Sequence, residues 1–173
     1  AMAHACGVSV EGELGCLGSL ETGAAGEEDG SGAEGILSHD QLLTNPEQAA
    51  DFVQKTGVDL LAPSVGSLHG MLKKGNPKLD IPRIENIAKV SGALLVLHGG
   101  SGTSNEDFIA AIKAGMHIVH INTEIRVAYR KGIETILTAD ASEIAPYTYL
   151  AKGREAVREV VYKRIKLFSN YHM

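Results

Sequence analysis

Tryptophan is absent from the 173-residue sequence, and cysteine occurs only twice. Cys6 and Cys16 are too few for the disulfide framework of a small secreted domain, and their spacing is not that of a metal knuckle. No secretory pattern precedes them, so we expect a protein of the reducing cytoplasm. The first six residues resemble the last turn of a helix that Gly7 closes, without a start signal, and we expect further chain upstream.

Clusters of basic residues and long apolar runs are missing too. The 16 lysines and arginines are scattered among 21 acidic residues, and the net charge of −5 leaves no positive surface to follow a phosphate backbone. The longest apolar run, residues 87–97, is interrupted by Lys89 and Gly92 and falls short of the roughly 20 residues that cross a bilayer. We therefore expect neither a nucleic-acid partner nor a membrane.

The hydrophobic content of 44% is enough for a single domain, 1–173, with a core, but the chain is too short for an ordinary closed barrel of eight α/β units. Apolar segments recur, each before a polar loop and a helical pattern, which is typical of βα units. The predicted strands lie at residues 8–14, 58–65, 93–98 and 118–121. An amphipathic helix over about residues 149–168 is predicted to end the chain.

Two of the predicted helices have clear boundary signals. Asn45 followed by Pro46 is an N-cap with a proline in the first turn, and Gly57 is a typical C-terminal stop. Asp80 and Gly92 bracket the next helix in the same way. These residues predict helices over about 46–56 and 82–91.

Consecutive parallel strands with right-handed helical crossovers form either an open doubly wound sheet or part of a closed barrel. Polar and glycine-rich residues at all four predicted strand ends favour the barrel, whose sites lie at the carboxyl ends of its strands. The predicted fold class is therefore α/β, with the last four βα units of a TIM-type (β/α)8 barrel followed by a C-terminal helix. Such a half barrel has two open sheet edges unless an N-terminal half barrel or a second copy of the chain covers them.

Two histidines follow predicted strand ends, each directly before a glycine. His98 precedes Gly99, and His69 precedes Gly70. Either imidazole could be an ordinary hydrogen-bonded residue in a tight turn, but two of them at neighbouring strand tips indicate shared metal coordination. A catalytic zinc takes three protein ligands, so this pair is one ligand short. The glycine-rich turn over residues 98–102 leads to a helix start and could cradle a phosphate.

Carboxylates occupy two further positions. Glu11 and Glu13 share one face of the first predicted strand, where they line a polar cavity or serve as structural hydrogen-bond acceptors. Glu28 lies on a glycine-rich acidic loop over residues 15–35, which we expect to be mobile. That loop is either a solvated surface loop or a lid that carries a general base. His120 is expected near the tip of the fourth strand.

Taken together, these residues resemble the class II fructose-bisphosphate aldolases over essentially the entire chain. The resemblance rests on five ordered motifs: VEGELG at residues 10–15, GEEDG at 26–30, GSLHG at 66–70, HGGSG at 98–102 and INTEIR at 121–126. Two further segments, residues 19–23 and 39–44, are more similar to the fructose-bisphosphate than to the tagatose-bisphosphate subgroup. Tagatose-bisphosphate cleavage remains an alternative.

The resemblance implies zinc-dependent aldol cleavage and condensation of fructose 1,6-bisphosphate, in glycolysis and gluconeogenesis, to dihydroxyacetone phosphate and glyceraldehyde 3-phosphate. It implies that His69 and His98 bind the zinc ion, that Glu13 lies near a second metal position, and that Glu28 is the base that removes a proton from dihydroxyacetone phosphate. It also implies a homo-oligomer and a monovalent cation near Gly70 and Gly99. The implied substrate-binding residues are Gly70, Gly99, Ser101, Asn122 and Thr123.

The sequence departs from the family pattern in two places. The family carries its third zinc histidine, and the aspartate that protonates the aldehyde oxygen, in an Asp-His motif that does not occur here. We expect both in the other half of the barrel, so that this chain alone is incomplete for catalysis. The family's usual Asn-Ile-Asn-Thr also begins with His120 here. A non-catalytic half-barrel module that associates with itself is the other interpretation.

Overall fold

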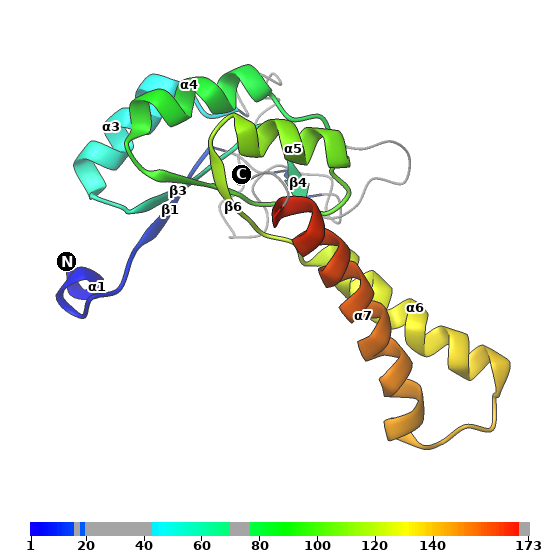
Figure 1. The fold of residues 1–173 in the computed structure, drawn as a ribbon. Helices are drawn as coiled ribbons and strands as arrows, with labels where there is room; N and C mark the ends of the chain where they lie inside the picture. The colour runs from blue at the N-terminus through cyan, green and yellow to red at the C-terminus, as the bar shows by residue number, and fades with distance from the viewer. Residues whose placement is uncertain (16–17, 20–42, 70–76, 170–173) are drawn as a thin grey trace. The chain divides into compact units, whose positions relative to one another are not determined.

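The computed structural model describes residues 1–15, 18–19, 43–69 and 77–169, and its chain divides into two compact units, Ala1–His120 and Ile121–Met173 (Figure 1). Most of the predicted acidic loop over residues 15–35 lies outside the described residues. The first unit begins with the short helix α1 (Met2–Ala5). None of the helices in the described part of the chain combines the length and apolar character that crossing a bilayer requires.

A four-stranded parallel sheet forms the centre of the first unit. Its strands are β1 (Glu11–Leu14), β3 (Leu60–Pro63), β5 (Leu94–Leu97) and β6 (Met116–Val119), and they pair in the order β1-β3-β5-β6. Two shorter strands, β2 (Gly18–Ser19) and β4 (Leu68–His69), form a separate parallel pair. The order of the main sheet never reverses, as it would at the centre of a doubly wound sheet, so it favours the barrel that the sequence predicts.

Three helices connect the strands of the main sheet. They are α3 (Pro46–Thr56), α4 (Ile81–Ser91) and α5 (Asn105–Lys113), and Figure 1 shows them together along one side of the sheet. Right-handed crossovers between successive parallel strands place every helix on the same face. The core lies between these layers and includes the fully buried side chains of Leu61, Ile84, Ile87, Leu95 and Phe108.

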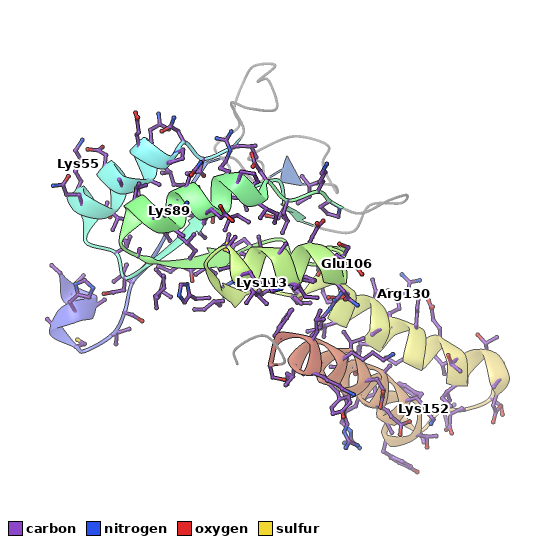
Figure 2. The ribbon with its side chains drawn as sticks, turned by 45° about the horizontal axis from the view of Figure 1, so that its top comes forward. Lys55, Lys89, Glu106, Lys113, Arg130 and Lys152 are labelled. Atoms are coloured by element: carbon purple, nitrogen blue, oxygen red, sulfur yellow. The ribbon has the colours of Figure 1, made fainter. Side chains whose placement is uncertain are left out.

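The helix boundaries follow the predicted signals. The Asn45 side chain accepts hydrogen bonds from the first-turn N–H groups of α3 at 2.8 and 3.1 Å, and Gly57 ends that helix with a φ of 68°. Asp80 caps α4, and Gly92 ends it. Lysines also lie in the last turns of α3, α4 and α5, where the helix dipole favours a cation. Figure 2 labels these lysines as Lys55, Lys89 and Lys113.

The strand boundaries differ more from the predictions. The fourth strand was predicted at residues 118–121 but is Met116–Val119, because a bulge in the pairing of β5 with β6 sets its register. Leu95 pairs with Met116, whereas Val96 pairs with Ile118. The predicted first strand is also too long, since β1 begins only at Glu11.

The second unit is a pair of helices, α6 (Thr123–Ala139) and α7 (Pro146–Ser169), joined by a short loop. Gly132 and Gly153 let the two helices approach closely, because a Cβ atom on Gly132 would lie 2.5 Å from the carbonyl oxygen of Lys152. Arg164 binds Glu124 across the pair through two hydrogen bonds of 3.0 and 2.9 Å. The chain thus contains the predicted C-terminal helix, beginning three residues earlier than expected.

Candidate metal centre

The alternation of β1 places its two carboxylates on the side of the sheet that faces away from the helices. Gly12 faces α3, since a Cβ atom there would lie 2.7 Å from the ring of Phe52. Successive side chains of a strand point to opposite faces. Glu11 and Glu13 therefore project together from the other face, as the sequence pattern predicts.

His98 follows β5 directly and lies against both carboxylates. Its Nε2 atom is 2.7 Å from Oε1 of Glu11, and its Nδ1 atom is 3.5 Å from Oε2 of Glu13. The His98 side chain is 18% exposed and so is partly shielded from solvent, whereas the side chains of Glu11 and Glu13 are 30% and 48% exposed. One imidazole thus joins strands that are far apart in the sequence.

His120 is fixed beside His98 by its own backbone. Its N–H group donates to the carbonyl oxygen of Leu97 at 2.9 Å, and its carbonyl oxygen accepts from the N–H of Gly100 at 3.2 Å. Glycine is needed at that point of the turn, because a Cβ atom on Gly100 would lie only 3.0 Å from the His120 carbonyl oxygen. The two imidazole rings are stacked, with centroids 4.8 Å apart and planes inclined by 20°.

Glu11, His98 and His120 together form a group that fits a metal ion. Each residue offers one ligand atom, and these atoms all lie within 4.8 Å of one another. Two imidazole nitrogens and one carboxylate oxygen are a donor set typical of zinc and other first-row divalent ions, and three protein ligands leave a coordination position open. Ligands at zinc bond lengths lie about 3.3 Å apart around a tetrahedral ion, so small side-chain movements would bring this set to the required spacing.

The turn after β5 also has features of an anion site. Gly99 and Gly102 adopt positive φ angles of 63° and 85°, which leave the turn tightly folded before α5. Ser101 and Thr103 are each 3% exposed, and the Thr103 hydroxyl has no hydrogen-bond partner among the described residues. Backbone N–H groups in such a turn can bind a phosphate.

The remaining predicted site residues lie in other places or outside the described residues. Glu28 and Gly70 belong to segments that the structure does not describe. His69 ends β4, and only its backbone is described. Asn122 and Thr123 begin α6 in the second unit, where the Thr123 hydroxyl accepts a hydrogen bond from Arg126 at 3.3 Å.

The structure adds two residues to the predicted metal ligands. The sequence indicated His69, His98 and Glu13, whereas the described side chains bring Glu11 and His120 to His98, with Glu13 at its other nitrogen. A signal for His120 was present, because it follows a strand adjacent to the one that ends at His98. A signal for Glu11 was present as well, since it shares a strand face with Glu13.

The whole chain is similar to proteins of one enzyme family. Residues 1–172 match the model of the class-II fructose-bisphosphate aldolases. A fructose-bisphosphate aldolase of Stutzerimonas stutzeri is 46% identical over 97% of this chain and 55% of its own length. A plasmid-encoded fructose-bisphosphate aldolase of Cupriavidus necator is 44% identical, over 96% of this chain and 56% of its own length. The chain thus spans about half the length of the curated relatives it matches.

Solved structures show the same relation. The YdjI aldolase of Escherichia coli K12 is 28% identical and superposes with a TM-score of 0.73 over 99% of this chain and 53% of its own. The fructose-bisphosphate aldolase of Campylobacter jejuni, 22% identical, gives a TM-score of 0.70 over 95% of this chain and 53% of its own, and shows the fold alone. The predicted half-barrel fold is therefore confirmed.

Proposed function

Because the chain belongs to the class II fructose-bisphosphate aldolase family, as its five motifs predict, we propose that it supplies one half of a metal-dependent aldolase site. The reaction is the cleavage of fructose 1,6-bisphosphate to dihydroxyacetone phosphate and glyceraldehyde 3-phosphate, and its reverse. The observation that carries the proposal is His98 at a strand end, held against two carboxylates beside a phosphate-binding type of turn. The part of the barrel that the relatives have and this sequence does not would complete the site.

In this proposal His98 and His69 hold a zinc ion, and Glu13 lies near a second metal position. When bound, the ion polarises the ketone of the substrate and makes the neighbouring C–H group more acidic. Glu28 takes the proton from that carbon and returns it in the opposite direction of the reaction. A carboxylate serves as such a base when closure of a loop excludes water from it.

The phosphate and hydroxyl groups of the substrate are assigned to three segments of this chain. Gly99 and Ser101 offer backbone and hydroxyl donors in the turn before α5, and Gly70 does so after β4. A monovalent cation near Gly70 and Gly99 would offset the charge of the phosphate. Asn122 and Thr123 offer the side-chain amide and hydroxyl that hydrogen-bond substrate oxygens.

A chimaera tests the proposal. The N-terminal part of the Stutzerimonas stutzeri relative, up to the point where its similarity to this chain begins, is joined to residues 1–173, and cleavage of fructose 1,6-bisphosphate is followed with and without zinc. We expect zinc-dependent cleavage that falls by about a thousandfold or more in Glu28→Gln, since the base is lost. A folded, zinc-loaded chimaera without activity refutes the proposal. Parallel assays with tagatose 1,6-bisphosphate decide between the two subgroups.

A non-catalytic module that associates with itself is the second candidate. In the sheet of the first unit β1 and β6 are the outer strands, and Leu94 and Ile118 are 49% and 36% exposed. Open strand edges and exposed apolar side chains favour pairing with another polypeptide. Light scattering on the isolated chain separates the candidates, because a stable oligomer that binds no ketose bisphosphate favours the module.

A further inference from the structure

We infer that Glu11, His98 and His120 form a divalent-metal site that this chain assembles by itself. The ligands are the Glu11 carboxylate and one nitrogen of each imidazole, and the ion is a first-row divalent metal such as zinc or cobalt. This site shares His98 with the zinc pair of the proposed function and adds Glu11 and His120 as ligands, and it does not depend on that function. It contains only residues of the first unit.

The three side chains converge before any ion is present. Their potential ligand atoms lie within 4.8 Å of one another, and His98 Nε2 already lies 2.7 Å from Oε1 of Glu11. A metal between these two atoms replaces the proton that they share. The stacked ring of His120, 4.8 Å away between centroids, then supplies the third ligand with a small rotation.

The ligands are also held in place from behind. Both backbone polar groups of His120 are hydrogen-bonded to the strand end and turn that carry His98. Glu13 lies 3.5 Å from Nδ1 of His98, so it can accept the N–H hydrogen bond of an imidazole whose Nε2 binds metal. A carboxylate behind a ligating histidine fixes the tautomer and the ring orientation. Little side-chain freedom remains to be lost on binding.

The donor set selects the kind of ion and the kind of site. Imidazole nitrogens favour zinc, cobalt, nickel and copper over magnesium and calcium, which take oxygen ligands. Three protein ligands that include the solvent-exposed side chains of Glu11 and His120 leave room for water or a substrate oxygen at the ion. The site therefore has the open form of catalytic centres rather than the closed form of structural ones.

Metal titration of the full 173-residue chain tests the inference without reference to activity. The protein is freed of metal and titrated with Zn²⁺ against a chromophoric chelator, and with Co²⁺ while its visible absorption is recorded. We expect one tight equivalent in the wild type. Glu11→Gln, His98→Asn and His120→Asn each raise the zinc Kd by about tenfold or more and weaken the Co²⁺ spectrum.

Two further variants make the test specific. His117→Asn is the matched control, because His117 is an exposed histidine of β6, the strand that His120 follows, and is outside the ligand group. It should leave the zinc Kd unchanged. Loss of binding in His69→Asn together with unchanged binding in His120→Asn overturns the inference, as does an equal loss in His117→Asn.

Folding is checked by circular dichroism of each metal-free variant. If His120→Asn changes that spectrum, the milder His120→Gln takes its place, and unchanged zinc affinity in that variant overturns the inference. Failure of the aldolase proposal is a separate result. If the chimaera is inactive but the triad still binds zinc, the proposed function alone is refuted. If the chimaera is active but His120→Asn does not change zinc binding, the triad alone is refuted.

Discussion

Replacing Gly15 by alanine should destabilise the first unit far more than the same change at Gly57. Both glycines have positive φ angles, 103° and 68°, so alanine is strained at either position by about 1–2 kcal/mol. A Cβ atom at Gly57 would meet nothing within 4 Å, whereas at Gly15 it would lie 2.6 Å from the Thr44 hydroxyl and 2.8 Å from Cβ of Ser64. Gly57→Ala therefore measures the backbone strain alone.

The contact at Gly15 also disrupts a buried hydrogen-bond network. The Thr44 hydroxyl donates to the carbonyl oxygen of Leu14 and accepts from the N–H of Ser64 at 2.8 Å, and Thr44 is 2% exposed. Moving this hydroxyl breaks both of its hydrogen bonds while it stays buried, at a cost of about 1–3 kcal/mol. We thus expect a loss of about 1–2 kcal/mol for Gly57→Ala and of about 3–4 kcal/mol for Gly15→Ala.

Urea unfolding of both variants, followed by circular dichroism, gives the two free energies. The comparison is sound only if the urea dependence of the free energy is the same in both, because a changed slope indicates a changed unfolded state. Equal destabilisation by the two substitutions would refute the argument, since the Thr44 contact would then have no measurable cost. The position matters for the site because Gly15 follows directly on the strand that carries Glu11 and Glu13.

Two further outcomes follow from the structure. Gly132→Ala should destabilise the α6–α7 pair by about 1–2 kcal/mol in thermal unfolding, because the added Cβ atom would lie 2.5 Å from a backbone carbonyl oxygen. This overpacking outweighs the better helix propensity of alanine. Thr135→Ala, on the exposed side of α6, should have no such effect. Hydrogen bonds from the N–H of Val10 and from the His4 side chain lower the pKa of Asp59 in the folded protein. The Asp59 carboxylate therefore stabilises the fold at any pH above its pKa in the unfolded state, and this contribution is lost as the pH falls through the lower pKa of the folded state. Asp59→Asn should flatten this acid limb of the stability curve, and an unchanged limb would contradict the assignment.

Local chemistry explains which parts of the fold could be predicted from the sequence. The limits of α3 were predicted to the residue, since Asn45, Pro46 and Gly57 act through their own backbone and side-chain geometry. The limits of β6 depend instead on a bulge in its pairing with β5, and no residue of β6 alone signals it. Strand register is a property of two segments, whereas a helix cap is a property of one.

The same distinction applies to the candidate site. The position of His98 at a strand end follows from the apolar run before it, but its contact with Glu11 joins residues 87 positions apart in the sequence. That contact depends on how the strands tilt within the barrel-type sheet, which periodicity does not determine. His120 was expected near the tip of the fourth strand and was noted as a departure from a family motif, but not as a metal ligand. Its role as a neighbour of His98 needed the pairing of β5 with β6.

The triad also has a consequence for the fold, because its ligands come from both outer strands of the sheet and from the strand next to β6. Glu11 begins β1, His98 follows β5, and His120 follows β6 in the order β1-β3-β5-β6. One ion bound to all three therefore links the two outer strands of the described sheet across the two inner strands, β3 and β5. An ion that binds the folded form alone stabilises it by about 4 kcal/mol at a thousandfold excess over its Kd. Among the described residues β1 and β6 have a neighbour on one side only, so such a cross-link supplies part of the stability that closure of the barrel would otherwise provide. The same residues that are suited to chemistry then also hold the sheet together.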